Sequence, residues 1–404
     1  MSNPKTTKGE NMKRLSLWAG AAALATMAFS ATTGTAIAGP TCENGTIAVG
    51  AVSTITGIVN FSDAPNGAKA MFDALNAAGG IDGCKIDFTI ADDKFDPAVA
   101  AQAARDLIDN KGVVALAGSA SLLDCAVNAA TYQRNGVLAI QGLGVDPLCF
   151  NAPSVAPVNV GPYTLTEAMG YYADTVLKAE KLCAFFIILG GTQEAYLQAI
   201  ANYEKRGGKK IHLVDLTLPP QGDLTAYLIK SRDSGCDAVV TNAVEPNIVQ
   251  WINTADAQQI TGINWLFLAP GYTEGLAKAL AATKQPIYIG TEWEPFTEAS
   301  DANKEWDAAM TKAGLPKTAF SQGGYLAAKI LIQIIKGIEG PVTRETVTAA
   351  LKGMQPISDP LAGSPYVFGD APVHAPMQAT KVMELVAGKW VLKTPEWLVL
   401  PPLN

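Results

Sequence analysis

The sequence is poor in charged, aromatic and histidine side chains. Of its 404 residues, 17% are charged, 7% are aromatic and two are histidine, and the formal net charge is −7. An acidic chain without a basic patch disfavours nucleic acid and anionic membranes as partners. After residue 38, no run approaches the roughly 18 consecutive apolar residues that a membrane-spanning helix needs. What remains is a globular chain long enough for about two domains.

Signatures of catalysis are also missing. Neither H-E-x-x-H nor G-x-S-x-G occurs, and the segment 141–147 lacks the third glycine of a dinucleotide-binding turn. His212 and His374 stand apart, and no cysteine pair has the C-x-x-C spacing of a zinc or redox site. We therefore expect no cofactor, no metal and no catalytic residue. A periplasmic hydrolase that uses Glu292 and Glu294 is the enzymatic alternative.

The first residues have the features of an export signal. A Lys-Arg pair at 13–14 precedes the apolar run 15–29, and Ala36-Ile37-Ala38 supplies small residues for cleavage. We interpret 1–38 as a signal peptide that directs the chain to the periplasm or another extracytoplasmic compartment. Either Met1 or Met12 could be the true start.

Apolar segments alternate with helical ones, which is typical of an α/β fold with parallel sheets. In the first half, the expected strands are 46–52, 85–91, 113–117 and 137–141, and the expected helices are 66–78, 98–110 and 123–133. After a Pro-rich stretch, strands are expected at 183–189, 211–218, 236–243 and 265–269, and helices at 164–179, 193–206, 224–234 and 246–258. The chain therefore contains two flavodoxin-like, doubly wound units.

The remaining residues are expected to complete both units. The expected elements are a strand at 287–290, helices at 303–313, 319–338 and 344–354, and strands at 379–385 and 389–392. If the helices join the first unit and the last strands the second, the chain crosses between the units near 160, 292 and 355. This predicts one lobe from 39–159 plus 293–354, a second from 160–292 plus 355–404, and a hinge of three crossovers.

All six cysteines follow the signal segment, and an even number in an exported chain indicates disulfides. In the strand order 2-1-3 that is usual for flavodoxin-like sheets, Cys42 and Cys84 lie at one end of neighbouring strands. The same holds for Cys183 and Cys236 in the second unit. The pairs Cys42–Cys84 and Cys183–Cys236 follow, and Cys125–Cys149 is left as the third.

Ligands of open α/β sheets bind at the carboxyl ends of the strands, and here those ends are uncharged. The segments in question are 53–54, 119–123, 141–144, 190–193, 241–244 and 270–272. Such loops offer backbone N–H groups, hydroxyls and amides, which suits binding better than catalysis.

Several motifs resemble those of the type I periplasmic solute-binding proteins of ABC importers, in the branched-chain amino-acid and amide-binding branch. They are T-I-T-G at 54–57, AMFDALNAAGGIDG at 70–83, D-D-K-F-D-P at 92–97, G-S-A-S at 118–121 and Y-L-A-A at 325–328. The resemblance covers about 46–392. It implies a two-lobed clamshell with three crossovers that closes on a small molecule and delivers it to the permease subunits of an ABC transporter. We expect a monomer.

The resemblance weakens at the ligand. Leucine-type members hold the amino acid's carboxylate with hydroxyls and its ammonium with an acid, and here the corresponding loops at 121–123, 143–145 and 270–272 lack most of these groups. Because an unpaired buried ammonium is costly, we expect a hydrophobic or aromatic acid or neutral compound rather than a zwitterionic amino acid. The candidate ligand-binding residues are Phe61, Ser119, Ser121, Leu122, Leu123, Gln141, Leu143, Gly144, Gln193, Val244 and Tyr272. Two competing hypotheses are that the ligand is a branched-chain amino acid or amide, and that the protein is a sensor that signals to a membrane receptor.

Overall fold

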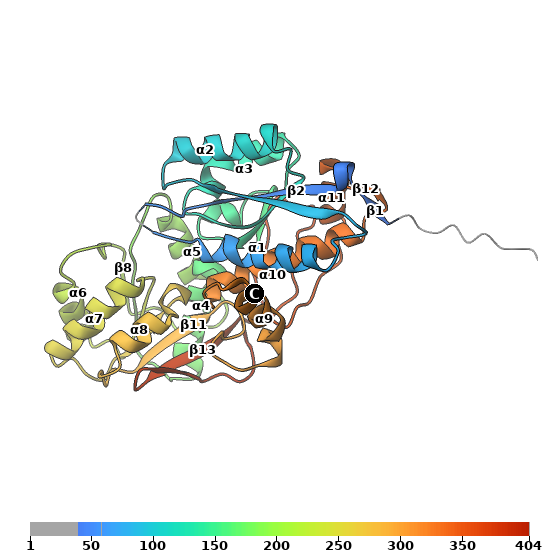
Figure 1. The fold of residues 1–404 in the computed structure, drawn as a ribbon. Coiled ribbons are helices and arrows are strands. Elements are labelled where there is room, and N and C mark those ends of the chain that lie inside the picture. The colour runs from blue at the N-terminus through green and yellow to red at the C-terminus, as the bar shows by residue number, and fades with distance from the viewer. Residues whose placement is uncertain (1–38, 58, 404) are drawn as a thin grey trace, which may run out of the picture. The chain divides into compact units, whose positions relative to one another are not determined.

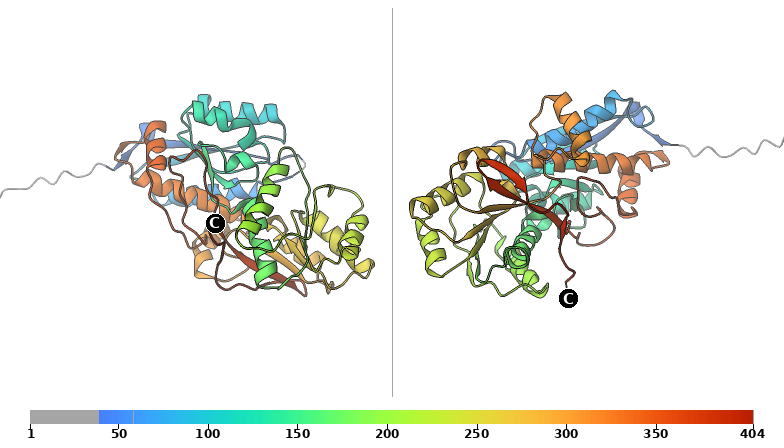
Figure 2. Two further views of the ribbon diagram at one scale, coloured as in Figure 1. Left: turned by 180° about the vertical axis from the view of Figure 1, so that it is seen from behind. Right: turned by 90° about the horizontal axis from the view of Figure 1, so that it is seen from below.

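The computed structural model describes residues 39–57 and 59–403, so the expected signal peptide lies outside the described residues. Two sheets organise the described chain, and each is covered by helices (Figures 1 and 2). Among the described residues, no helix is both long and apolar enough to cross a bilayer.

The first sheet has five parallel strands in the order β3-β2-β4-β5-β6. These strands are β2 (Thr46–Ser53), β3 (Lys85–Asp92), β4 (Ala115–Ala120), β5 (Ala139–Leu143) and β6 (Val155–Pro157). Its helices are α1 (Asp63–Ala77), α2 (Pro97–Arg105), α3 (Asp124–Arg134), α10 (Ala319–Lys336) and α11 (Arg344–Lys352). Helices α2 and α3 cover one face, and α1 and α10 cover the other (Figure 1).

The second sheet runs β14-β13-β11-β10-β9-β7-β8, with β15 paired to β13. Its strands are β7 (Leu182–Phe185), β8 (Leu213–Asp215), β9 (Ala238–Thr241), β10 (Asn264–Phe267), β11 (Ile287–Thr291), β13 (Ala379–Val386), β14 (Lys389–Leu392) and β15 (Leu398–Val399). Its helices are α4 (Gly161–Thr175), α5 (Gln193–Lys205), α6 (Thr225–Asp233), α7 (Glu245–Ala257) and α8 (Glu274–Ala279). Strands β7 to β11 are parallel, and the last three are antiparallel additions.

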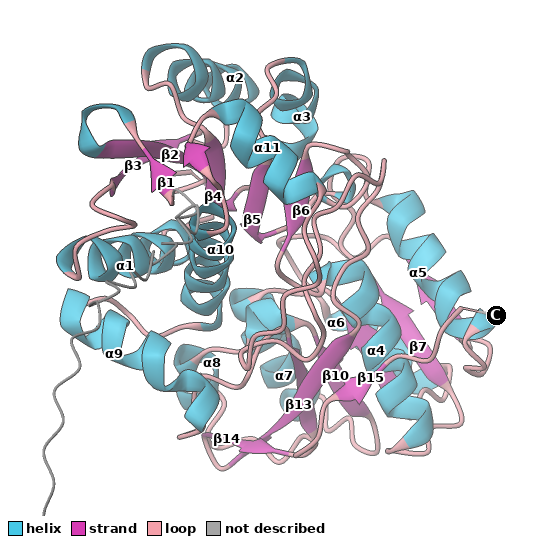
Figure 3. Ribbon diagram, turned by 90° about the vertical axis from the view of Figure 1, so that its right-hand side faces the viewer, coloured by secondary structure: helices cyan, strands magenta, loops and turns pink. Residues whose placement is uncertain are grey.

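Smaller elements complete the chain. They are β1 (Pro40–Thr41), which pairs with β12 (Gly340–Pro341), the helix α9 (Lys304–Ala313), the π-helix η2 (Asp106–Asn110), and the 3-10 turns η1 (Glu43–Gly45), η3 (Pro147–Cys149), η4 (Ala269–Gly271) and η5 (Asp301–Asn303). Figure 3 shows both sheets and the loops that run between them.

Local chemistry explains where helices begin. Asp96 accepts hydrogen bonds from the N–H groups of Ala98 and Val99, and Pro97 occupies the first position of α2. Thr318 and Ser321 form a reciprocal cap on α10. That helix lies so close to α1 that a Cβ on Gly324 would overlap the carbonyl group of Ala64.

The predicted α/β class, the strand order 2-1-3 and all three disulfides are confirmed. The Cα atoms are 6.0 Å apart in Cys42–Cys84, 5.1 Å in Cys125–Cys149 and 5.9 Å in Cys183–Cys236. Each pair joins segments that neighbouring strands bring to one end of a sheet. The proposed lobe boundaries themselves stay a prediction.

Some elements differ from the sequence prediction. The strand expected at 183–189 ends at Phe185, because the N–H of Ile187 bonds to the side chain of Asn242 at 2.9 Å instead of to a neighbouring strand. Helix α8 and strand β6 were not expected. Strand β6 is an edge strand that ends at Pro157, a position where the missing N–H costs no ladder hydrogen bond.

Candidate functional site

The carboxyl edge of the first sheet carries a buried cluster of Thr54, Asp93 and Ser121. The Thr54 hydroxyl donates to Asp93 Oδ2 at 3.1 Å, and the Ser121 hydroxyl donates to the same oxygen. Ser121 Oγ also accepts the N–H groups of Leu123 and Asp124, each at 2.9 Å, at the start of α3. The predicted ligand residue Ser121 is therefore already engaged on both its donor and its acceptor sides.

The neighbouring Asp92 organises the loop after β2. Its carboxylate accepts the N–H groups of Ile55, Thr56 and Lys94 and the hydroxyl of Thr56, which lies 2.6 Å away. Burial by itself would raise the pKa of Asp92, but these hydrogen bonds outweigh it and lower the pKa to about 2. Asp92 is thus an ionised anchor for its own loop.

A second buried acid, Asp124, holds the candidate residue Gln141. Asp124 accepts from Tyr132 at 2.5 Å, from Asn128 at 2.8 Å and from Gln141 Nε2 at 2.7 Å. Burial raises the pKa of Asp124, and the hydrogen bonds from Tyr132, Asn128 and Gln141 oppose that rise. The Nε2 of Gln141 is thereby used inside the lobe, and its Oε1 has no partner among the described residues.

The other predicted residues of the first lobe divide by exposure. Ser119 is fully buried, and its hydroxyl accepts the N–H of Val52 at 3.1 Å. Leu143 and Gly144 are buried as well. Leu122, Leu123 and Phe61 are partly exposed at the same edge. In this conformation Leu122, Leu123 and Phe61 are the accessible candidates of the first lobe.

The carboxyl edge of the second sheet exposes apolar side chains. Val244 after β9 is 41% exposed and Leu189 after β7 is 49% exposed, while the candidate Gln193 lies exposed at the start of α5. Tyr272 is only 2% exposed, and its hydroxyl pairs with Thr297 Oγ1 at 2.7 Å.

Two asparagines hold the loops at these edges, and sequence reasoning missed both. Asn242 accepts the N–H of Ile187 and donates to its carbonyl, each at 2.9 Å. Asn159 accepts the N–H of Gly144 at 2.9 Å and donates to its carbonyl at 3.1 Å. The one available sequence signal was their position next to strand ends.

The acids considered for hydrolysis are both buried. Glu292 accepts from Asn159 Nδ2 at 2.8 Å and from the N–H of Gly161 at 2.7 Å, and burial raises its pKa to about 7 against the opposing hydrogen bonds. Glu294 pairs with Lys381 at 2.7 Å. Neither carboxylate is free to act on a substrate in this conformation.

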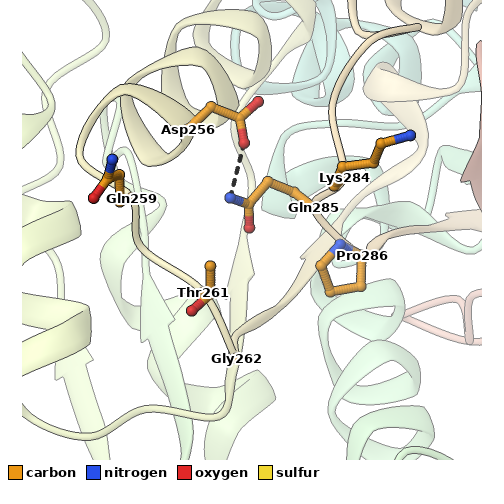
Figure 4. A pocket seen from close by; sticks show the side chains of 7 residues that line it. All are labelled: Asp256, Gln259, Thr261, Gly262, Lys284, Gln285 and Pro286. Carbon is orange, nitrogen blue, oxygen red and sulfur yellow. Dashed lines mark hydrogen bonds between the residues drawn. The ribbon is translucent and has the colours of Figure 1, made fainter.

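Two surface cavities lie outside the predicted site. One, of about 300 Å³, lies at the amino ends of β10 and β11, where Gln285 Nε2 donates to Asp256 Oδ1 at 2.9 Å (Figure 4). It is lined by Asp256, Gln259, Thr261, Gly262, Lys284, Gln285 and Pro286. The other, of about 350 Å³, lies beside α8 and β14. Neither includes a candidate ligand residue.

The sequence from 46 to 389 matches the family described as "Periplasmic binding protein". The chain belongs to the periplasmic binding protein family, so the family resemblance that the motifs indicated is confirmed. This family is one of solute-binding proteins rather than of enzymes.

Curated relatives are distant. A "Leu/Ile/Val-binding protein homolog 3" of Brucella melitensis is 24% identical over 348 residues, which are 82% of this chain and 88% of that protein. An "Amino acid binding protein" of Pseudomonas aeruginosa is 25% identical over 202 residues, which are 48% of this chain and 52% of that protein. The match thus spans only about half the length of the Pseudomonas protein.

Solved structures share the fold. The branched-chain amino acid transporter substrate-binding protein LivJ of Streptococcus pneumoniae, in complex with isoleucine, has a TM-score of 0.72 and 21% identity, covering 88% of this chain and 100% of that one. A fatty acid ABC transporter substrate-binding protein of Thermomonospora curvata has a TM-score of 0.71 and 17% identity, covering 91% of this chain and 95% of that one. At such identities the likeness establishes the fold alone.

Proposed function

We propose that this protein captures a small hydrophobic or aromatic acid, or a neutral compound of that kind, between the carboxyl edges of its two sheets. It then delivers the compound to the permease of an ABC transporter in an extracytoplasmic compartment. We infer the class of ligand from the carboxylates at the strand ends, which are already bonded to other groups of the protein. Each of seven already accepts a hydrogen bond or forms an ion pair within the protein; they are Asp92, Asp93, Asp124, Asp215, Glu245, Glu292 and Glu294.

This arrangement disfavours a ligand that carries an ammonium group. An ammonium taken out of water needs a carboxylate beside it, and an acid that already serves protein donors is a poor partner. The exposed side chains of Leu189 and Val244, with the partly exposed Leu122 and Leu123, offer an apolar surface instead. The N–H groups of Leu123 and Asp124 are taken by Ser121, so one polar or carboxylate end of the ligand would have to be held by other N–H groups of the first turn of α3.

Calorimetry on the full chain tests the ligand class. Benzoate, phenylacetate and octanoate are titrated beside leucine and valine, after mass spectrometry has identified any compound that co-purifies. Binding of at least one of the first three, with none of leucine or valine, supports the proposal. Tight binding of leucine with none of the hydrophobic compounds refutes it.

A matched pair of variants tests the location. Val244→Thr keeps the shape of the side chain and adds a hydroxyl at the proposed edge, whereas Val399→Thr makes the same change at a residue that is 55% exposed in β15. We expect Val244→Thr to weaken binding of phenylacetate about fivefold, because a hydroxyl must be desolvated, and Val399→Thr to leave it unchanged. Equal behaviour of the two variants would place the site elsewhere.

A branched-chain amino acid is the second candidate ligand, and one observation favours it. Glu194, on the first turn of α5, is exposed and follows the loop after β7, so its carboxylate could meet an ammonium group. If leucine binds, Glu194→Gln should weaken it by about tenfold or more, because it removes the charge that pairs with the ammonium. Unchanged leucine affinity in Glu194→Gln would exclude this role.

A further inference from the structure

Asn159 is a fully buried amide whose hydrogen-bonding groups are all used. It follows β6 and precedes α4, where the chain passes from the first sheet to the second. Its Oδ1 accepts the N–H of Gly144, and its two Nδ2 hydrogens go to the carbonyl of Gly144 and to Glu292 Oε1. The side chain of Asn159 therefore forms hydrogen bonds with both the N–H and the carbonyl of Gly144.

Glu292 links Asn159 to the second segment that passes between the two sheets. It follows β11, and its Oε1 accepts both from Asn159 and from the N–H of Gly161, so it ties the segments 158–161 and 291–294 together. We call these two the hinge segments. Trp293 Nε1 adds a bond to the carbonyl of Val158 at 3.2 Å.

The third segment that passes between the sheets also forms a hydrogen bond with Asn159. The N–H of Met377, in the stretch between α11 and β13, lies 3.4 Å from the carbonyl oxygen of Asn159. Asn159 thus lies in the first of the three segments that pass between the two sheets, and it bonds to the other two and to the loop after β5.

The loop that Asn159 holds is part of the proposed ligand site. Leu143 ends β5 and Gly144 follows it, and the carbonyl of the next residue, Val145, accepts from the hydroxyl of Tyr163 in α4 at 3.2 Å. A side chain on Gly144 would meet the ring of Pro157, so this backbone packs directly against the end of β6, next to the hinge segment 158–161. Any shift of the hinge segments must therefore move or release this loop.

We propose that Asn159 and Glu292 are positioning residues: they fix the loop 143–145 to the hinge segments, so that the affinity for ligand depends on them although neither side chain is exposed to touch it. This inference rests on the proposed function, because it takes the loop after β5 as part of the ligand site. Its structural half, the fixing of the loop, can be measured without any ligand.

Asn159→Ala removes the hydrogen bonds that hold Gly144, and Asn76→Ala is the matched control. Asn76 holds Ile86 in the same two-bonded way, at 2.8 Å and 2.8 Å, but at the amino end of β3. Amide exchange of the peptide 143–149 is followed by mass spectrometry, and binding of phenylacetate by calorimetry. We expect Asn159→Ala to speed exchange of this peptide and to weaken phenylacetate binding, each by about tenfold, and Asn76→Ala to change neither.

A pair of variants at Glu292 covers the case in which Asn159→Ala fails to fold. Glu292→Gln keeps an oxygen that can accept from Asn159, whereas Glu292→Ala does not. Exchange of the peptide 143–149 should stay within about twofold of wild type in Glu292→Gln and rise about fivefold in Glu292→Ala.

The outcomes separate this inference from the proposed function. Wild-type exchange of the peptide in Glu292→Ala and in any folded Asn159→Ala would overturn the inference, and so would an equal loss of affinity in Asn76→Ala. If phenylacetate fails to bind the wild type, the choice of ligand fails, and the exchange rates still decide whether these residues fix the loop.

Discussion

Ionisation of Glu292 should make the stability of this protein fall between mildly acidic and neutral pH. Burial raises the pKa of Glu292 from 4.5 to about 7 in the folded chain, with the bonds from Asn159 and Gly161 opposing part of that rise. Between these two values the folded state keeps a proton that the unfolded state has lost, so the stabilisation is complete below about pH 4.5 and is lost as the pH rises through about 7. Each pH unit is worth about 1.4 kcal/mol, so the interval of two and a half units corresponds to about 3 kcal/mol.

Glu292→Gln isolates this effect, because glutamine has the same shape and does not titrate. The free energy of unfolding is measured by denaturant titration between pH 4 and pH 8 for wild type, Glu292→Gln and Glu339→Gln, which removes the same charge from an exposed side chain. We expect the difference between Glu292→Gln and wild type to shift by about 3 kcal/mol in favour of glutamine over this range. We expect no such shift for Glu339→Gln. A difference for Glu292→Gln that stays constant within about 1 kcal/mol would refute the reasoning.

Three further outcomes follow from packing and charge. Gly324→Ala should lower the free energy of unfolding by about 3 kcal/mol, because its Cβ would overlap the carbonyl of Ala64; a loss below about 1 kcal/mol in denaturant titration would contradict this. Lys381→Met should cost about 4 kcal/mol, because it leaves Glu294 buried without its partner, and combining it with Glu294→Gln should recover part of the loss. His374 is buried, which lowers its pKa below 6.5, so the folded state resists a proton that the unfolded state accepts. The contribution of His374 to stability should therefore fall as the pH drops below about 6.5, and the difference in melting temperature between His374→Leu and wild type should shift in favour of leucine in thermal scans from pH 7 to pH 5.

The fold could be predicted because local signals agreed with one another. Alternating apolar and amphipathic segments indicated two parallel sheets, and the order of the strands then placed each cysteine next to its partner. The predicted end of the strand at 183–189 was wrong, because a side chain takes the place of a neighbouring strand as the hydrogen-bond partner. The N–H of Ile187 bonds to Asn242 rather than to a neighbouring strand, and no apolar pattern reports such a bond.

The candidate site was harder to predict, because a strand-end position does not tell where a side chain's bonds go. Ser119 and Gln141 lie at strand ends as expected, but the hydroxyl of one accepts the N–H of Val52 and the amide of the other donates to Asp124. Those partners come from other elements. Asn159 was not predicted at all, because one of its hydrogen-bond partners, Glu292, lies more than a hundred residues away in the chain.

The two lobes share a way of building an edge without charge. In each, an asparagine next to a strand end binds both backbone groups of one loop residue: Gly144 in the first lobe and Ile187 in the second. A neutral amide can do this at no cost of a buried charge, whereas the buried acids of the same edges already accept hydrogen bonds from other parts of the protein. The surface left between such edges is shaped by fixed backbone and apolar side chains. A charged ligand that needs a counter-charge from the protein would gain little there, whereas one with an apolar body would gain free energy because its apolar surface is removed from water.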